Sequence, residues 1–337
     1  MYYLYQDESL RAQHNAVRTT AGWYDFTHRL MEVTGPDALD FLNKMFVVNL
    51  ENQGVGKAKY TTMLDEDGWI CDDVIIFRLE EEKYWISTLY TKDMEKRFGW
   101  YAEDYDVDYQ VITEDWRMYS VQGPKSPELV NLVLNDPVDD LKFFNIRDAS
   151  MRDIPMKVAR SGYTGEKFGY ELYVPAEHEQ ELVDKLTEAG EKVGAMHVTE
   201  VDVCAMTLPA EAGYYLMLDL RRYTPFETGF ENTIDWKKNF VGKKALRKLR
   251  NEEPKRKLVA FDCPDYDAVI YGGPGPKGND VYTPDGKWVG RVTKFTYGYT
   301  VEKNIGYMVI DTAYTEVGTQ LKCNGYDLIV AEKNRLA

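Results

Sequence analysis

Two adjacent carboxylates lie in an otherwise apolar strand, and folding alone explains them poorly. The segment 69–77 reads Trp-Ile-Cys-Asp-Asp-Val-Ile-Ile-Phe, which predicts a strand after the acidic turn at residues 65–68. Successive side chains of a strand point to opposite faces, so Asp72 and Asp73 point in opposite directions. Burying an unpaired carboxylate is costly, and burial raises its pKa so that it can accept or share a proton. The strand therefore predicts either an acid–base site or two structural acids bonded to loop amides.

A second candidate is a glutamate that follows a glycine-rich turn. The run 159–172 contains Gly162, Gly165 and Gly169, and Glu171 lies on the strand that leaves the turn. Glycine permits tight turns and close approach of the backbone to a ligand. An ionised carboxylate can accept paired N–H donors from a flat heterocycle. The run therefore predicts either a ligand-binding glutamate or a simple hairpin with an exposed one.

Composition narrows the class of partner. The formal net charge of −15 argues against a nucleic acid or an anionic membrane surface as the main partner. No stretch approaches the roughly 18 to 20 apolar residues of a membrane span, and the N-terminus lacks the pattern of a signal peptide. The four cysteines and four histidines have no metal-ligand spacing, so we expect no metal site. These features favour a cytoplasmic protein.

The elements that must position these carboxylates alternate between helices and strands. We expect helices at residues 8–21, 38–45, 91–101, 127–134 and 178–189. We expect further strands at residues 30–33, 84–87, 118–121, 156–160 and 170–174. The order is typical of an α+β fold with helices packed on antiparallel or mixed sheets, and it suggests a weak internal duplication.

The tail of the chain has a different character. From residue 257 onward, short β-like runs alternate with glycine-rich turns, which predicts a small all-β barrel or sandwich. The basic link at 244–257 is a domain boundary or one solvated helix. We therefore expect two regions, residues 1–250 and 257–337.

Several runs together resemble one family. They are His-Asn-Ala-Val-Arg-Thr-Thr-Ala-Gly-Trp-Tyr-Asp-Phe-Thr-His at 14–28, Met-Leu at 63–64, Asp-Asp-Val-Ile at 72–75, Gln-Gly-Pro at 122–124, Gly-Tyr-Thr-Gly-Glu at 162–166, Gly-Tyr-Glu at 169–171, Glu-Ala-Gly at 211–213, Thr-Pro-Phe-Glu-Thr-Gly-Phe at 224–230, Asn-Phe-Val-Gly-Lys-Lys-Ala-Leu at 239–246, Gly-Arg-Val-Thr at 290–293 and Ile-Gly-Tyr at 305–307. In this order they resemble the aminomethyltransferase family, which comprises the glycine cleavage T-protein and its tetrahydrofolate-dependent relatives. The resemblance covers nearly the whole chain.

The resemblance implies a fold and a set of roles. The fold is a ring of two ferredoxin-like α+β units and a C-terminal β-barrel, with a central channel for folate. The family's catalytic acid falls on Asp72, which would assist release of ammonia and orient the folate. Its pterin-binding glutamate falls on Glu171, and Tyr163 and Met63 are further folate contacts by the same resemblance. Asp73, pointing the other way, is expected to be a structural acid.

Three departures from the family pattern concern the substrate. Only residues 1–13 precede the Ala-Val-Arg helix, where T-proteins carry a longer stretch. Ala205 stands where the family has an arginine that contacts folate, and residues 86–90 lack the family's asparagine. The scaffold motifs persist while ligand contacts change. We therefore expect the same folate chemistry with a donor that can differ.

The leading hypothesis is a tetrahydrofolate-dependent enzyme that moves an aminomethyl or methyl group from a small donor to tetrahydrofolate. An alternative is a demethylase of a methylated amine, sulfonium or aryl ether, because the faces of its 25 tyrosines can stabilise methylated cations. A second alternative is a non-catalytic folate-binding protein that supports iron–sulfur enzymes, whose signature cysteine is absent from residues 239–244. Expected partners are the donor and either a lipoyl carrier protein or a separate amine-oxidase subunit.

Overall fold

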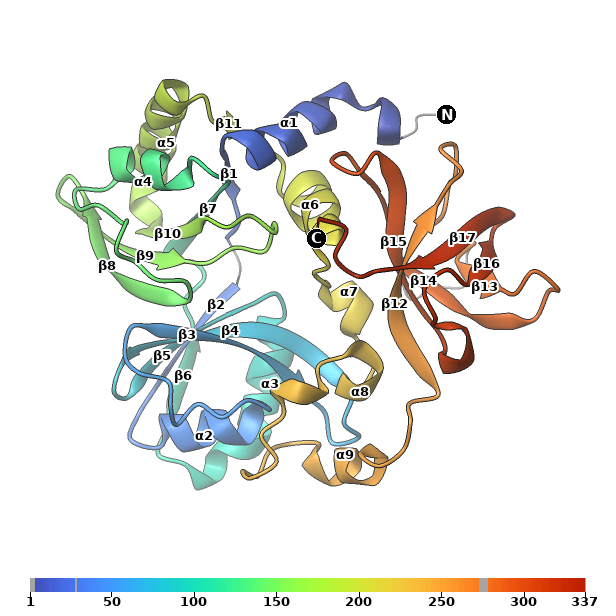
Figure 1. Ribbon diagram of the computed structural model, residues 1–337. Coiled ribbons are helices and arrows are strands. Elements are labelled where there is room, and N and C mark those ends of the chain that lie inside the picture. Colours follow the sequence, from blue (N-terminus) through green and yellow to red (C-terminus); the bar gives the residue numbers. More distant parts are fainter. Residues whose placement is uncertain (1–3, 28, 273–277, 337) are drawn as a thin grey trace.

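The computed structural model describes residues 4–27, 29–272 and 278–336. His28 and residues 273–277, parts of the sequence patterns above, lie outside the described residues. The elements form three parts around the short helices α6 (Leu208–Ala212) and α7 (Met217–Leu220), as Figure 1 shows. The chain returns to this centre at its end, beside α6 (Figure 1).

The first α+β unit is a five-stranded sheet with helices on one face. Its strands, which pair in the order β3-β4-β5-β2-β6, are β2 (Arg29–Thr34), β3 (Lys57–Leu64), β4 (Ile70–Glu80), β5 (Lys83–Thr88) and β6 (Asp108–Val111). Helices α2 (Ala38–Met45) and α3 (Thr91–Tyr101) have the predicted bounds and share a buried apolar cluster with Val74 and Ile76 of β4. The predicted hairpin of β4 with β5 is confirmed.

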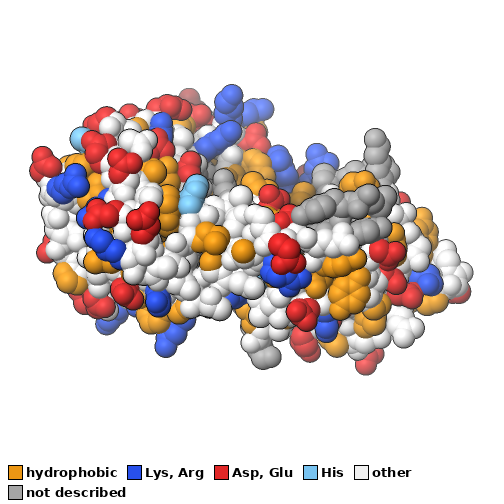
Figure 2. Space-filling view, turned by 90° about the horizontal axis from the view of Figure 1, so that it is seen from above, with side chains coloured by type: hydrophobic (Ala, Val, Ile, Leu, Met, Phe, Trp, Pro, Cys, Tyr) orange, Lys and Arg blue, Asp and Glu red, His pale blue; other side chains and the backbone are white. Residues whose placement is uncertain are grey.

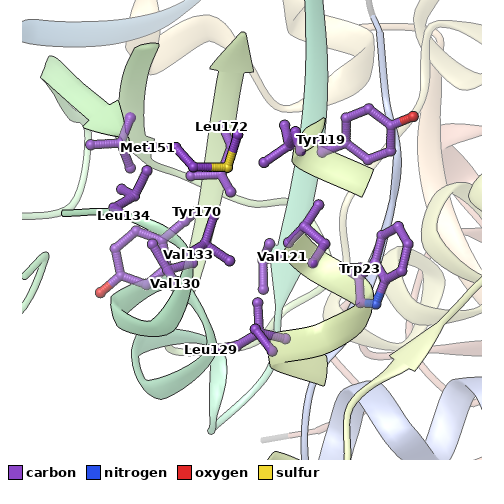
Figure 3. Close-up of a cluster of buried hydrophobic side chains, with 14 of the residues drawn as sticks. Trp23, Tyr119, Val121, Leu129, Val130, Val133, Leu134, Met151, Tyr170 and Leu172 are labelled. Carbon is purple, nitrogen blue, oxygen red and sulfur yellow. The ribbon is translucent and has the colours of Figure 1, made fainter. Parts of the chain in front are cut away.

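The second α+β unit repeats this layout with six strands. In the order β11-β1-β7-β10-β9-β8, they are β1 (Gly22–Asp25), β7 (Trp116–Gln122), β8 (Asn145–Met151), β9 (Ile154–Arg160), β10 (Gly169–Pro175) and β11 (Met196–His197). Helices α4 (Ser126–Val133) and α5 (Glu179–Val193) cover one face. Figure 3 shows Leu129 and Val133 of α4 meeting Val121 and Leu172 of the sheet. Full burial of each such side chain contributes about 1.5–3 kcal/mol to folding.

The two units are continuous, because β3 and β8 pair at Lys57 and Asn145 and make one eleven-stranded sheet. The sheet faces that carry no helix turn toward each other. Tyr173 of β10 packs against Phe77 of β4 and Trp85 of β5, with ring centroids 5.9 and 5.8 Å apart. Any ligand held by both units therefore has to lie on these inner faces.

The C-terminal part is the predicted barrel. Its strands close in the order β12-β15-β14-β13-β16-β17 and are β12 (Arg256–Cys263), β13 (Asp280–Tyr282), β14 (Trp288–Gly298), β15 (Lys303–Asp311), β16 (Gln320–Cys323) and β17 (Tyr326–Ala331). The basic link contains helix α9 (Lys243–Leu249), and the expected boundary at 250–257 falls between α9 and β12. An α+β fold with a closed C-terminal barrel is thus confirmed.

A buried carboxylate joins the parts. Glu211 on α6 lies 3.2 Å from Nε2 of His14 and accepts a 3.0 Å hydrogen bond from Arg18, both on α1 (Glu8–Thr19). The backbone N–H of Thr300, in the turn after β14, donates to the same carboxylate at 2.8 Å. Burial raises the pKa of Glu211, but His14 and Arg18 outweigh it and lower the pKa to about 2. The ionised carboxylate therefore ties α1, α6 and the barrel together.

The glycine-rich run is explained by packing inside the protein. A Cβ at Gly162 would lie 2.0 Å from Oε1 of Gln122, and one at Gly169 would lie 2.3 Å from the same atom. Gly165, with a φ of +85°, lies against Ala212 of α6, where an added Cβ would approach to 2.4 Å. Of the two alternatives for this run, the hairpin accounts for the glycines, because the space beside them is filled by Gln122 and α6.

Helical segments follow β11, and the surface carries charges of both signs. Between β11 and α7 the chain forms a π-helix (Glu200–Thr207) that runs into α6, and α8 (Pro225–Thr228) follows α7. Acidic and basic side chains are interspersed on the face drawn in Figure 2. Within the described ranges, the helices are all too short or too polar to cross a bilayer.

Replacing Gly162 by Ala should destabilise the fold by about 1–3 kcal/mol, because the new methyl group overlaps the buried Gln122 amide. Urea unfolding measures this change. Gly54→Ala is the matched control, since its new Cβ meets only the Lys57 side chain at 3.8 Å. Equal unfolding free energies for the two variants would contradict the packing explanation.

Candidate functional site

The two carboxylates of β4 occupy different environments, as the strand alternation predicts. Asp72 points to the face that packs on α2 and α3, together with Val74 and Ile76. Asp73 points to the inner face, together with Ile75 and Phe77. The inner face is the one that turns toward the second α+β unit, so the carboxylate with access to both units is that of Asp73.

Asp73 is partly exposed and held by a tyrosine. The hydroxyl of Tyr60, on β3, donates a 2.8 Å hydrogen bond to Oδ2 of Asp73. Burial raises the pKa of Asp73 to about 6, against the lowering effect of the Tyr60 hydrogen bond. A carboxyl group with a pKa close to neutrality can both give and take a proton under physiological conditions.

Asp72 is fully buried on the helix-covered face. The Thr88 hydroxyl donates a 2.5 Å hydrogen bond to its Oδ2, while Oδ1 has no hydrogen-bond partner within the described ranges of the chain. Burial raises the pKa of Asp72 to about 8. Met63 lies opposite it on β3 and packs in the apolar cluster under α2. Asp72 and Met63 therefore both lie on the helix-covered face of the sheet, and their roles as catalytic acid and folate contact stay predictions.

Glu171 lies on the inner face of the second unit. It stands in a row across three strands with Tyr24 of β1 and Ser120 of β7. The side chain is 3% exposed, and the Tyr173 hydroxyl donates a 2.8 Å hydrogen bond to Oε2. Burial raises the pKa of Glu171, and the Tyr173 hydrogen bond opposes that rise. Glu171 is thus an acceptor on the wall that faces Asp73.

Tyr163, on the loop after β9, feels the charge of both carboxylates. Its hydroxyl is buried and has no hydrogen-bond partner among the residues that the structure describes. The pKa of Tyr163 is raised first by burial and then by the charges of Glu171 and Asp73, so both carboxylates lie within its electrostatic reach. Native structures rarely leave a buried hydroxyl unpaired. The orphaned hydroxyl is therefore a donor or acceptor that a ligand between the two units can satisfy.

A third wall comes from the segment around α7 and α8. The Phe230 ring lies 5.9 Å from that of Tyr60 and 6.2 Å from that of Tyr215, as measured between centroids. All three rings are partly exposed although they lie where the parts meet. They offer flat apolar surfaces on which a planar heterocycle can stack. Ala205 lies in the π-helix and brings no charge to this region.

The arrangement suits a flat, hydrogen-bonding ligand. Glu171 can accept N–H donors at one end, aromatic rings can cover the faces, and Asp73 can handle a proton at the other end. Among the residues described, no cluster of three or more His, Cys, Asp or Glu side chains is placed to hold a metal ion. The roles that the resemblance gives to Asp72, Glu171, Tyr163 and Met63 stay predictions, and sequence patterns did not show that Asp73, bonded to Tyr60, points to the inner face.

Comparisons with known proteins show a family for the chain. The family model of the GCVT N-terminal domain matches residues 2–238, and that of the glycine cleavage T-protein C-terminal barrel domain matches residues 256–324. The aminomethyltransferase of Thermoanaerobacter sp. (strain X514) is 32% identical over 94% of this chain and 85% of its own length. That of Bacillus cytotoxicus is also 32% identical, over 94% of this chain and 86% of its own length.

A solved structure supports the fold. Aminomethyltransferase T of the glycine cleavage system from Bartonella henselae superposes with a TM-score of 0.86 at 22% identity, covering 96% of this chain and 88% of that one. The expected α+β fold with its barrel therefore has a counterpart among known structures.

Replacing Asp72 by Asn should stabilise the protein increasingly as pH rises. The folded-state pKa of about 8 exceeds the ordinary value of 3.8, so folding favours the protonated acid. The free energy of unfolding of the wild type therefore falls as pH rises toward 8. That of D72N does not fall for this reason, because the amide does not titrate. Thermal melts between pH 5.5 and 8.5 should show a widening advantage for the variant. The exposed Asp67→Asn change should show no such trend, and a pH-independent difference for D72N would contradict the burial argument.

Proposed function

The chain belongs to the glycine cleavage T-protein family of aminomethyltransferases, and we propose that it transfers a one-carbon unit to tetrahydrofolate in the space between Asp73 and Glu171. The observation that carries the location is the buried Tyr163 hydroxyl, which has no partner in the described part of the chain and feels the charge of both carboxylates. Family membership supports the reaction, and the inner-face geometry supports the site.

Each carboxylate has a separate task in this proposal. Glu171 binds the pterin ring by accepting its N–H donors, and the Tyr173 hydrogen bond keeps the carboxylate in place. Tyr163 hydrogen-bonds the ligand near the middle of the site. Bound tetrahydrofolate would supply the nucleophilic nitrogen that accepts the carbon unit.

Asp73 transfers the proton and stabilises positive charge at the end of the site where the carbon unit is transferred. An amine leaves an aminomethyl group only when it carries an extra proton, and the cation that develops at the carbon is stabilised by a nearby carboxylate. The pKa of about 6 lets Asp73 serve both purposes near neutral pH. The Tyr60 hydroxyl fixes its orientation through the 2.8 Å hydrogen bond. Asp72, the acid that the sequence resemblance selects, remains the alternative for this role.

The relatives and the aromatic wall favour two classes of donor. Relatives named aminomethyltransferase favour an aminomethyl unit presented by a lipoyl carrier protein or a small molecule. The exposed faces of Tyr60, Phe230 and Tyr215 also suit a methylated cation, which supports demethylation as the second candidate. A donor screen with purified protein and tetrahydrofolate separates them, because aminomethyl donors yield 5,10-methylene product and methyl donors yield 5-methyl product.

Replacing Asp73 by Asn should lower turnover about 100-fold or more, since general acid–base catalysis typically contributes 10²–10⁴-fold. The affinity for tetrahydrofolate should change little, because Glu171 and the aromatic rings supply most of the binding. Steady-state kinetics and calorimetry measure the two effects. Asp72→Asn is the matched control on the same strand. A large loss of turnover in D72N with none in D73N would transfer the role back to Asp72.

Replacing Glu171 by Gln should weaken tetrahydrofolate binding by about 10- to 100-fold, the effect of losing a charged hydrogen-bond acceptor worth about 1.5–3 kcal/mol. Calorimetric titration of the purified protein gives the dissociation constant directly. Glu177→Gln, an exposed change soon after the same strand, should leave it unaltered. Unchanged affinity in E171Q would remove Glu171 from the pterin site.

A further inference from the structure

A buried ion pair crosses the contact between the barrel and α7. Nζ of Lys294, on β14, lies 3.2 Å from Oδ2 of Asp219, on α7, and both side chains are fully buried. The Thr293 hydroxyl donates a 2.6 Å hydrogen bond to Oδ1 of Asp219, and the backbone N–H of Leu216 donates to Oδ2 at 3.0 Å. Asp219 is therefore well satisfied and is held from both sides of the contact.

Lys294 is unusual for a buried cation. Its Nζ has no hydrogen-bond acceptor in suitable geometry within the described part of the chain, although Asp219 is near and the Tyr307 ring centroid is 5.1 Å away. It follows a shift in the register of β14 with β15, between Val292 and Lys294. Such bulges re-aim side chains. Apolar residues usually stabilise a buried contact at least as well as an ion pair does, so stability alone explains Lys294 poorly.

The segment that carries Asp219 is bonded to the strand that carries the proposed acid. Helix α7 leads directly onto β4, because the N–H of Arg222 donates to the carbonyl of Ile70 and the N–H of Ile70 donates to that of Tyr223, at 3.1 and 2.8 Å. The Asp219 charge adds to burial in raising the pKa of Asp73. Among the described residues, Tyr60, Asp72, Tyr90 and Tyr163 are further titratable groups whose electrostatics involve Asp73.

We propose that Lys294 is a positioning residue for the one-carbon transfer: by pairing with Asp219 it fixes α7 on the barrel and balances the negative charge that Asp219 presents to Asp73. The inference rests on the proposed function of Asp73. The position of the barrel against α7 then influences whether Asp73 is protonated. The barrel thereby affects the chemistry without touching the ligand.

The test uses three variants of the full-length protein. Lys294→Met removes the balancing charge, Asp219→Asn removes the negative one, and the double variant removes both. The titration midpoint of Asp73 is read by carboxyl ¹³C NMR, with its signal assigned by its loss in D73N. The midpoint should rise by about one pH unit in K294M, fall in D219N and return near the wild-type value in the double variant. The acid limb of the pH–rate profile should move in parallel.

Each outcome decides the proposal. An unmoved midpoint in K294M and D219N would overturn it, and so would a double variant that behaves like K294M. If K294M does not fold, D219N and the double variant still give the comparison. The NMR readout does not depend on turnover. If the midpoint of Asp73 shifts in K294M and D219N as predicted but D73N turns over at the wild-type rate, the catalytic role of Asp73 is refuted and the electrostatic coupling is not.

Discussion

The structure depends on one buried carboxylate, that of Glu211. It accepts hydrogen bonds from Arg18 of α1 and from Thr300 at the end of the barrel hairpin, and it lies against His14. Removing one partner from such a network typically costs about 3–5 kcal/mol, because the remaining charge stays buried. Gly165 packs against Ala212 of the same helix, α6. The loop that carries Tyr163 is therefore positioned by the contact that closes the three parts around the site.

Local elements of this fold were largely predictable from sequence. Helices α2 and α3, the β4–β5 hairpin and all six barrel strands follow from periodicity and turn residues. Other elements carry no local signal: α7 and α8 have four residues each, too few to show a helical repeat. The single pairing that joins β3 to β8 is a long-range contact, which periodicity does not encode.

Sequence likewise predicts part of the site and leaves the rest to tertiary packing. Alternation along β4 separates Asp72 from Asp73, but both faces of the strand are apolar, so sequence does not say which face is inward. The answer comes from tertiary packing, since α2 and α3 cover the Asp72 face while Tyr173 and Trp85 meet over the Asp73 face. Family resemblance selected Asp72 and Glu171, and the structure places Glu171 on the inner face and Asp72 on the helix-covered face, while their roles stay predictions. The glycines were interpreted as ligand-binding because Gln122, their real neighbour, is distant in sequence.

The central claim is that the pterin lies between the two α+β units, with Glu171 at one end and Asp73 at the other. A crystal structure of the protein with tetrahydrofolate bound tests it most directly. The account predicts pterin N–H groups on the Glu171 carboxylate, the Tyr163 hydroxyl hydrogen-bonded to the ligand and the reactive nitrogen facing Asp73. A pterin beside Asp72 and Met63, or one outside the space between the units, would contradict it.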